Sequence, residues 1–334
     1  MNLRSQWSVL VLFLLLVTSC SAAAEADGLR MRALPVLAGA HNDTSTPFNL
    51  VSMPALIGHR YDGRGLRIGG VLAQELTHTT HHVTYRSGTL RIGGALTVPT
   101  RPGRYPLVVL AHGFTDATSY RSGATMARER AYLTRRGYVV LQPDYRNHGD
   151  SDRDREGFVA RPLGYPEDVV NAVVAVRRAR LPFVDSRRVG LFGRSMGGGV
   201  ALAAAAARPG LVDAVVLYSP VSSWAPDTFR RWVVGSGELE TRVVEAYGRP
   251  HQRPRFWRNA SVRSYGHRVD VPVQIHHGTA DRVCPARWSR RTARSLRAAG
   301  QRVALHEYTG EGHAFDRSWG RLMRRSADFL DARV

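Results

Sequence analysis

The sequence contains no lysine and only two cysteines, Cys20 and Cys284. Its 47 basic residues are therefore all arginines, and they outnumber the acidic residues enough to give a formal net charge of +20. These arginines occur singly and in pairs along nearly the whole chain, whereas a nucleic-acid-binding protein would concentrate them on one helix or tail. We therefore attribute the excess to codon bias and expect no nucleic-acid partner.

The N-terminal region has only a short apolar run, from Trp7 to Val17, which follows Arg4. A membrane-spanning helix needs about 20 apolar residues, so this run is typical of a signal peptide, and we assign residues 1–19 to it. The following motif resembles a bacterial lipobox that ends at Cys20. We predict an exported lipoprotein that the lipid on Cys20 anchors in the cell membrane, or a secreted protein if Cys20 is not lipidated.

Signatures of cofactor or metal binding are missing as well. The chain has no phosphate-binding loop, no dinucleotide fingerprint and no metal-ligand spacing. His78, His81 and His82 cluster, but no carboxylate or cysteine accompanies them. We therefore expect no cofactor and no metal.

The rest of the chain has the pattern of an α/β protein. Residues 20–45 indicate a linker, and residues 46–334 are expected to form the folded domain, although 46–80 show no clear element. Alternating apolar residues predict two antiparallel strands within 82–98. Short, wholly apolar runs, typical of buried parallel strands, then alternate with helical stretches. The runs are residues 107–111, 138–141, 189–192, 212–218, 271–275 and 303–306. The helical stretches are residues 122–136, 166–180, 196–208, 286–299 and 316–332. We predict a mostly parallel sheet of about eight strands with helices on both faces.

One connection is too long for a simple crossover. About residues 221–268 separate two predicted strands and imply an insertion over the carboxyl ends of the strands, where it would act as a lid. Residues 227–247 are compatible with a helix, and residues 250–265 are rich in arginine and aromatic residues.

The motif Gly193-Arg194-Ser195-Met196-Gly197 follows a predicted strand and precedes an alanine-rich helix. This is the context of a nucleophile elbow, in which the serine occupies a strained turn and Gly193 and Gly197 avoid collisions with the backbone. Ser195 is therefore the candidate nucleophile.

A serine nucleophile requires a base and an acid. In enzymes with such a nucleophile elbow, the three residues follow one another along the chain in the order Ser, Asp or Glu, His. Asp281 comes directly after the run 271–275, and His313 follows the next run. Successive parallel strands deliver such residues to one edge of a sheet, so we predict a catalytic triad of Ser195, Asp281 and His313.

When the serine attacks a carbonyl carbon, the carbonyl oxygen becomes negatively charged. Two backbone N–H donors are needed to stabilise this oxyanion. Met196 follows the nucleophile and supplies one N–H by position, and the loop after residues 107–111 should supply the other. We choose Phe114, with Gly113 as the nearest alternative. His276 and His277 are expected to line the pocket or to pack rather than to catalyse.

With these motifs the chain resembles the catalytic domain of the prolyl oligopeptidase family of serine peptidases, and more loosely the dienelactone-hydrolase-like esterases. The resemblance covers residues 82–333 and rests on Gly193–Gly198, Ser219-Pro220, Pro272–Pro285 and Tyr308–His313. It implies the α/β-hydrolase fold and a serine hydrolase.

Members of that family carry a β-propeller before the catalytic domain, and the sequence has only about sixty residues between Cys20 and the first strand. We therefore favour a small ester as the substrate. The alternatives are a serine-type peptidase that acts on short acylaminoacyl or dipeptidyl substrates, and a non-catalytic lipoprotein that binds an envelope ligand.

Overall fold

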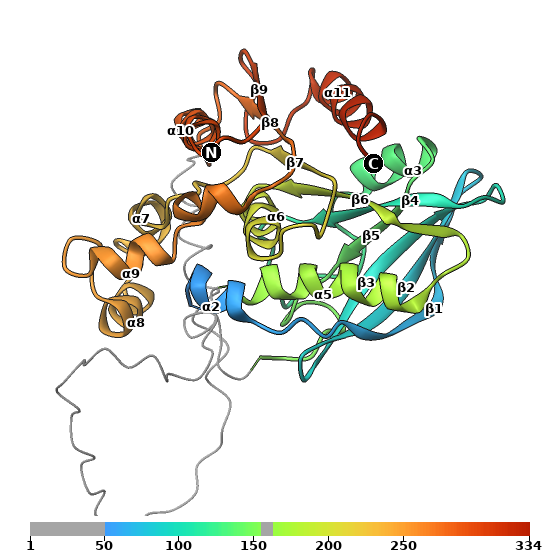
Figure 1. Ribbon diagram of the computed structural model, residues 1–334, viewed down its shortest axis with the longest axis horizontal. Coiled ribbons are helices and arrows are strands. Elements are labelled where there is room, and N and C mark those ends of the chain that lie inside the picture. Colours follow the sequence, from blue (N-terminus) through green and yellow to red (C-terminus); the bar gives the residue numbers. More distant parts are fainter. Residues whose placement is uncertain (1–50, 155–162) are drawn as a thin grey trace, which may run out of the picture. The chain divides into compact units, whose positions relative to one another are not determined.

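The computed structural model describes residues 51–154 and 163–334. The predicted signal peptide, Cys20 and the linker lie outside the described residues. Within these ranges, no helix is both long enough and apolar enough to cross a membrane. Nine strands form a single sheet in the order β1-β2-β3-β5-β4-β6-β7-β8-β9, which confirms the predicted fold class (Figure 1).

The first part of the sheet is antiparallel. β1 (Arg64–Gln74), β2 (His78–Ser87) and β3 (Leu90–Pro99) pair in succession, and β3 pairs with β5 (Val139–Pro143). The short helix α2 (Met53–Gly58) precedes them. The predicted count of about eight strands misses β1, which lies at the edge of the sheet with nearly all of its residues exposed. An edge strand with neither face buried has no reason to alternate apolar and polar residues.

The remaining strands pair in parallel, as the wholly apolar runs predict. They are β4 (Tyr105–Ala111), β5, β6 (Val184–Arg194), β7 (Ala214–Tyr218), β8 (Val273–Gly278) and β9 (Val303–Tyr308). Because their carboxyl ends meet at one edge of the sheet, the loops that follow them converge there.

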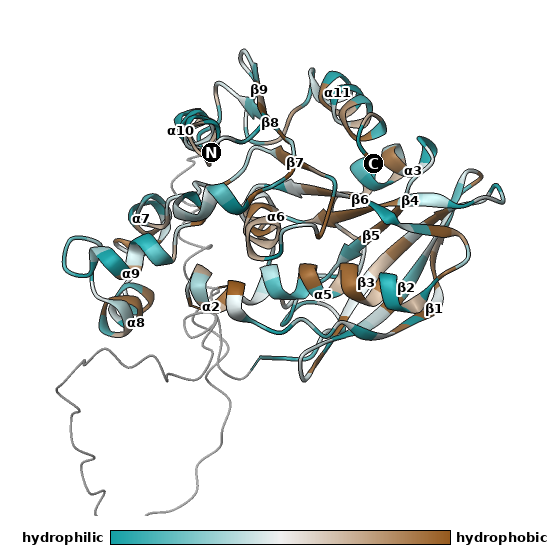
Figure 2. Ribbon diagram, in the orientation of Figure 1, coloured by the Kyte–Doolittle hydropathy of each residue, from teal (hydrophilic) through white to brown (hydrophobic). Residues whose placement is uncertain are grey.

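Helices cover both faces of this sheet, and alternate strand residues pack against each layer. The central strands of the sheet are largely hydrophobic (Figure 2). Leu107, Val109 and Ala111 belong to one apolar cluster, and Val108 and Leu110 belong to the other. The first cluster includes residues of α5 (Gly164–Ala179), α6 (Met196–Ala207) and α10 (Ala286–Ala298). The second includes residues of α3 (Ala127–Arg135) and α11 (Trp319–Asp331). Fully burying such an aliphatic side chain contributes about 1.5–3 kcal/mol, so the sheet is a rigid base for the loops at its edge.

The predicted insertion consists of five short helical segments between β7 and β8, which we call the cap (residues 225–268). They are α7 (Ala225–Thr228), the π-helix η1 (Phe229–Val233), α8 (Glu238–Tyr247), α9 (Pro254–Asn259) and the 3-10 helix η2 (Val262–Arg268). The expectation of one helix through residues 227–247 is wrong. Gly235 and Gly237 adopt positive φ angles of 81° and 67° and end the first helical segment before α8 begins.

Candidate active site

Ser195 lies in the sharp turn between β6 and α6. Its φ of 56° and ψ of −122° are strained for a residue with a side chain. The turn is tight enough that a Cβ on Gly193 would collide with the Gly197 carbonyl, and a Cβ on Gly197 would collide with the Ala111 carbonyl. These two glycines therefore allow the chain to present Ser195 at the edge of the sheet, as the elbow motif predicts.

The structure brings Ser195, His313 and Asp281 together. His313 Nε2 lies 2.9 Å from Ser195 Oγ, and its Nδ1 lies 2.8 Å from Asp281 Oδ2. A carboxylate can only accept hydrogen bonds, so Nδ1 carries the proton in the neutral ring and Nε2 is free to accept the serine proton. This is the arrangement that a general base requires.

Asp281 is held by several donors. Its Oδ1 accepts the backbone N–H groups of Val283 at 2.8 Å and Cys284 at 2.9 Å. Burial acts to raise the pKa of this carboxyl, but hydrogen bonds from His277 and His313 outweigh it and hold the pKa well below its usual range. The acid is therefore ionised and faces the imidazole as an anion.

Three backbone N–H groups are candidate donors to an oxyanion formed at Ser195, and two of them are required. The backbone at Gly113 passes so close to the nucleophile that an added Cβ would lie 3.2 Å from Ser195 Cβ. Across residues 51–154 and 163–334, no hydrogen bond occupies the N–H of Met196, Gly113 or Phe114. These donors therefore remain open to a ligand, and the Phe114 side chain beside them is 57% exposed.

The family of the chain follows from its match to a family model. Residues 124–334 match the model of the prolyl oligopeptidase family. The chain belongs to the prolyl oligopeptidase family. This family consists of serine hydrolases, and the matched region contains Ser195, Asp281 and His313.

Individual relatives match different parts of the chain. Mouse acyl-coenzyme A thioesterase 1 is 28% identical over 183 residues, which are 54% of this chain and 39% of the thioesterase. An uncharacterized 31.7 kDa protein of Escherichia coli is 34% identical over 116 residues, 34% of this chain and 38% of that protein. The chain thus spans less than two fifths of the length of these curated relatives.

Solved structures share the fold at low identity. Acetyl xylan esterase 1 from a Thermoanaerobacterium species has a TM-score of 0.61 and 21% identity, with 83% of this chain and 91% of the esterase covered. Acylaminoacyl peptidase from Pyrococcus horikoshii has a TM-score of 0.63 and 20% identity, with 76% of this chain and 41% of the peptidase covered. Both comparisons show the α/β-hydrolase fold.

The sequence did not predict the contact between His277 and the candidate acid. Its ring is fully buried, and Nε2 lies 2.7 Å from the Cys284 carbonyl and 3.1 Å from Asp281 Oδ2. Nδ1 lies 2.6 Å from Ser289 Oγ. Since both neighbours of Nε2 only accept, Nε2 carries the proton and Nδ1 accepts the serine hydroxyl. His277 therefore donates to the same carboxylate oxygen as His313.

The neighbouring His276 points to the other side of β8. Its ring contacts Tyr308 Oη at 2.8 Å and Gln274 Oε1 at 2.8 Å. Alternation along the strand separates the two rings, so His276 packs in the core as expected, while His277 contacts the acid. The only signal for this in the sequence is that His277 precedes Asp281 by four residues across a turn.

Cys284 brings a thiol to the same site. Its side chain is fully buried, and the cysteine is free. Burial raises the pKa of the thiol well above its usual range, although the Ser195 hydroxyl acts to lower the pKa of this thiol. The group is therefore neutral and packs as a small apolar side chain.

Proposed function

We propose that the protein hydrolyses a small ester through an acyl-enzyme on Ser195, with His313 as the general base and Asp281 as the carboxylate that orients it. The observation that carries this proposal is the continuous hydrogen-bond chain from Ser195 Oγ through both nitrogens of His313 to Asp281 Oδ2. The same arrangement performs acyl transfer in unrelated hydrolases.

In the first step Ser195 Oγ bonds to the carbonyl carbon of the ester while its proton passes to His313 Nε2. The carbonyl oxygen becomes an oxyanion, and the open N–H groups of Met196 and Phe114 are the donors we assign to it, with Gly113 as the alternative. Collapse of this intermediate breaks the bond to the alcohol, which leaves with the proton from His313. A water molecule then repeats the sequence and releases the carboxylic acid.

The ionised Asp281 acts electrostatically in both steps. It stabilises the imidazolium that forms when His313 accepts the proton, and it keeps the ring in the tautomer that starts the reaction. His277 and the two backbone N–H groups restrict the motion of this carboxylate. A carboxylate with four donors has little freedom to rotate away from His313.

An ester substrate is favoured over a peptide by the extent of the structural matches. The similarity to acetyl xylan esterase 1 extends over 91% of that enzyme, whereas the similarity to acylaminoacyl peptidase extends over 41% of that peptidase. The described residues thus correspond to a nearly complete esterase and to less than half of the peptidase.

The test is hydrolysis of a series of p-nitrophenyl esters beside aminoacyl-p-nitroanilides, with Ser195→Ala as the inactive control. We expect turnover of short esters by the wild type and none above background by the variant, and a fluorophosphonate should add its mass to the wild type alone. Preference for the anilides would instead support the peptidase alternative. A folded wild type that neither reacts with the fluorophosphonate nor hydrolyses either series would overturn the proposal.

A further inference from the structure

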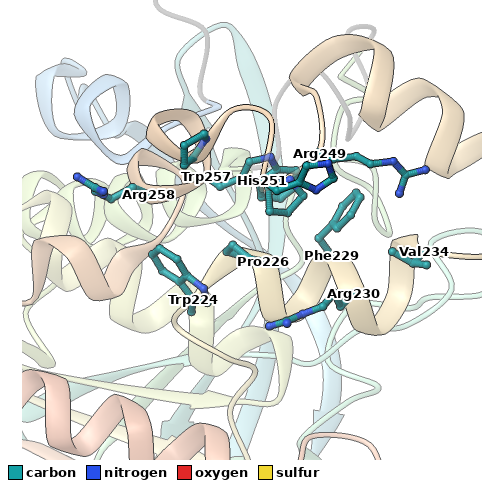
Figure 3. Close-up of a pocket in the computed structure, with 11 residues that line it drawn as sticks. Trp224, Pro226, Phe229, Arg230, Val234, Arg249, His251, Trp257 and Arg258 are labelled. Atoms are coloured by element: carbon teal, nitrogen blue, oxygen red, sulfur yellow. The ribbon is translucent and has the colours of Figure 1, made fainter.

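The cap contains two adjoining cavities. The larger, of about 540 Å³, lies between the α7–η1 segment and the segment around α9 (Figure 3). The smaller, of about 380 Å³, lies between η1 and α10. Arg230 lines both cavities, so a single extended ligand could occupy the two together.

The walls of these cavities are strongly basic. We call six of the lining residues the arginine wall: Arg230, Arg231, Arg249, Arg258, Arg287 and Arg291. Among residues 51–154 and 163–334, Asp227 has the only carboxylate that lines either cavity. The whole chain has 47 basic and 27 acidic residues, so the cavities are depleted in carboxylates well beyond the bias of the sequence.

Partners within the fold neutralise only part of this charge. Asp227 lies 2.7 Å from Arg230 and 3.9 Å from Arg291. Arg249 pairs with Glu240 at 2.7 Å. Arg258 and Arg287 are exposed, and no carboxylate of the described segments pairs with either of them. Planar guanidinium groups bind carboxylate and phosphate groups in a bidentate manner, so an anionic ligand would supply the missing charge.

The larger cavity also has aromatic walls, in which Phe229 and Trp257 pack edge to face with an interplanar angle of 61°. Their ring centroids lie 4.8 Å apart, and both side chains are nearly buried. Trp224 lies on the same cavity, under the guanidinium of Arg263 at 4.3 Å. These aromatic walls favour a ligand with an aromatic ring, because aromatic rings pack against one another edge to face or offset.

The smaller cavity borders the loop that carries the catalytic acid. Arg231 donates a hydrogen bond to the carbonyl of Arg282, the residue after Asp281. Asp281 in turn accepts a hydrogen bond from His313, whose other ring nitrogen lies 2.9 Å from Ser195 Oγ. A ligand in the smaller cavity would therefore lie beside the loop that holds the catalytic acid.

We propose that the cap selects an anionic ester, in which a phosphate or carboxylate group is attached to an aromatic ring, and that the arginine wall binds this group while Ser195 attacks the ester. This inference rests on the proposed function and narrows its substrate class. The arginines bind a part of the substrate that does not react, so they should lower KM and leave kcat nearly unchanged.

The experiment compares three acetate esters of similar shape: neutral p-nitrophenyl acetate, 4-acetoxybenzoate and 4-acetoxyphenyl phosphate. Arg258→Glu and Arg287→Glu each reverse one unpaired charge of the arginine wall. Arg294→Glu is the matched control, because Arg294 is exposed on α10 like Arg287 but lines neither cavity. Each variant is compared with the wild type on the same ester, so intrinsic differences between the esters cancel.

We expect kcat/KM for the anionic esters to fall by about tenfold or more in Arg258→Glu and Arg287→Glu, through KM, because each variant removes a charge-assisted hydrogen bond. The neutral ester should change by less than about twofold, and the control should change on no ester. Added salt should weaken the preference for anions. The relative effect on the phosphate and the carboxylate ester identifies which anion the wall prefers.

Equal losses on neutral and anionic esters, or equal effects of Arg294→Glu and Arg287→Glu, would overturn the inference while Ser195-dependent hydrolysis remained. If none of the three esters is hydrolysed, calorimetric titration of the wild type with phenyl phosphate decides the inference alone. Binding that Arg287→Glu weakens and Arg294→Glu does not would support it, and no binding would refute it.

Discussion

Replacement of His277 by leucine tests whether this buried ring controls the catalytic acid. Its Nε2–H is one of four donors to Asp281, and it binds the same oxygen as His313. A hydrogen bond to a charged group contributes about 1.5–3 kcal/mol. At about 1.36 kcal/mol for each factor of ten in rate, loss of this bond lowers kcat/KM by about 10-fold to 150-fold.

Stability has to be measured beside activity, because His277→Leu also removes partners from the Cys284 carbonyl and the Ser289 hydroxyl. A buried polar group without a partner costs about 1–3 kcal/mol, so the free energy of unfolding should fall by roughly 2–6 kcal/mol. Urea unfolding gives this value, and ester hydrolysis is then measured well below the midpoint of unfolding.

Two further variants separate positioning of the acid from general disruption. Ser289→Ala removes the partner of Nδ1 but keeps the Nε2–H bond to Asp281, so it should retain nearly full kcat/KM. His277→Gln keeps an N–H donor and should recover part of the activity that His277→Leu loses. A folded His277→Leu variant with kcat/KM within about threefold of the wild type, or an equal loss in Ser289→Ala, would refute the reasoning.

Four other predictions follow from the same structure. Gly197→Ala should abolish ester hydrolysis and lower the free energy of unfolding by about 1–3 kcal/mol or more, because its Cβ would collide with a backbone carbonyl, whereas Gly320→Ala, where nothing lies within 4 Å, should retain both. Cys284→Ala should keep activity within about tenfold, and iodoacetamide should not inactivate the wild type, because the buried thiol is neutral. Burial raises the pKa of Asp144 to about 6. The protonated carboxyl therefore contributes its full stability below about pH 4, and this stability is lost as the pH rises through about 6. In urea unfolding, the free energy of unfolding of Asp144→Asn should therefore rise by up to about 3 kcal/mol relative to that of the wild type between pH 4 and pH 7. Finally, Cys20→Ala should abolish incorporation of labelled palmitate in a bacterial host and move the protein from the membrane fraction to the soluble fraction.

The parallel strands and the elbow could be predicted because each has a strong local signal. A strand buried on both faces must be apolar throughout, as in Val189–Phe192, and the glycines of the elbow are fixed by collisions with nearby backbone. β1 has no such signal, because its two faces are exposed and only its backbone pairs with β2. Pairing through the backbone leaves little trace in the choice of side chains.

The contact between His277 and Asp281 could not be predicted, because it depends on a turn that tertiary contacts stabilise. Thr279 N–H donates to the Tyr308 carbonyl, and Ala280 N–H donates to the Glu311 carbonyl. These bonds fold residues 279–281 back over the end of β8 and bring the carboxylate to the ring. The alternation of residues along β8 predicts on which face of the sheet His277 lies, but it does not predict the path of the loop that follows the strand.

The arginine wall is even harder to predict from the sequence than the contact of His277. In a chain that uses arginine in place of every lysine, an arginine by itself does not indicate a binding site. Arg287 and Arg291 share one face of α10 by their i, i+4 spacing, and the fold brings Arg230 and Arg231 from the cap, more than fifty residues earlier in the sequence, to the same cavity. Some arginines elsewhere in the fold have carboxylates gathered around them. Arg146, for example, is buried against three carboxylates. A solvent-accessible cavity with six guanidinium groups and one carboxylate departs from that pattern, so the lack of carboxylates, rather than the presence of arginines, marks it as a site for an anion.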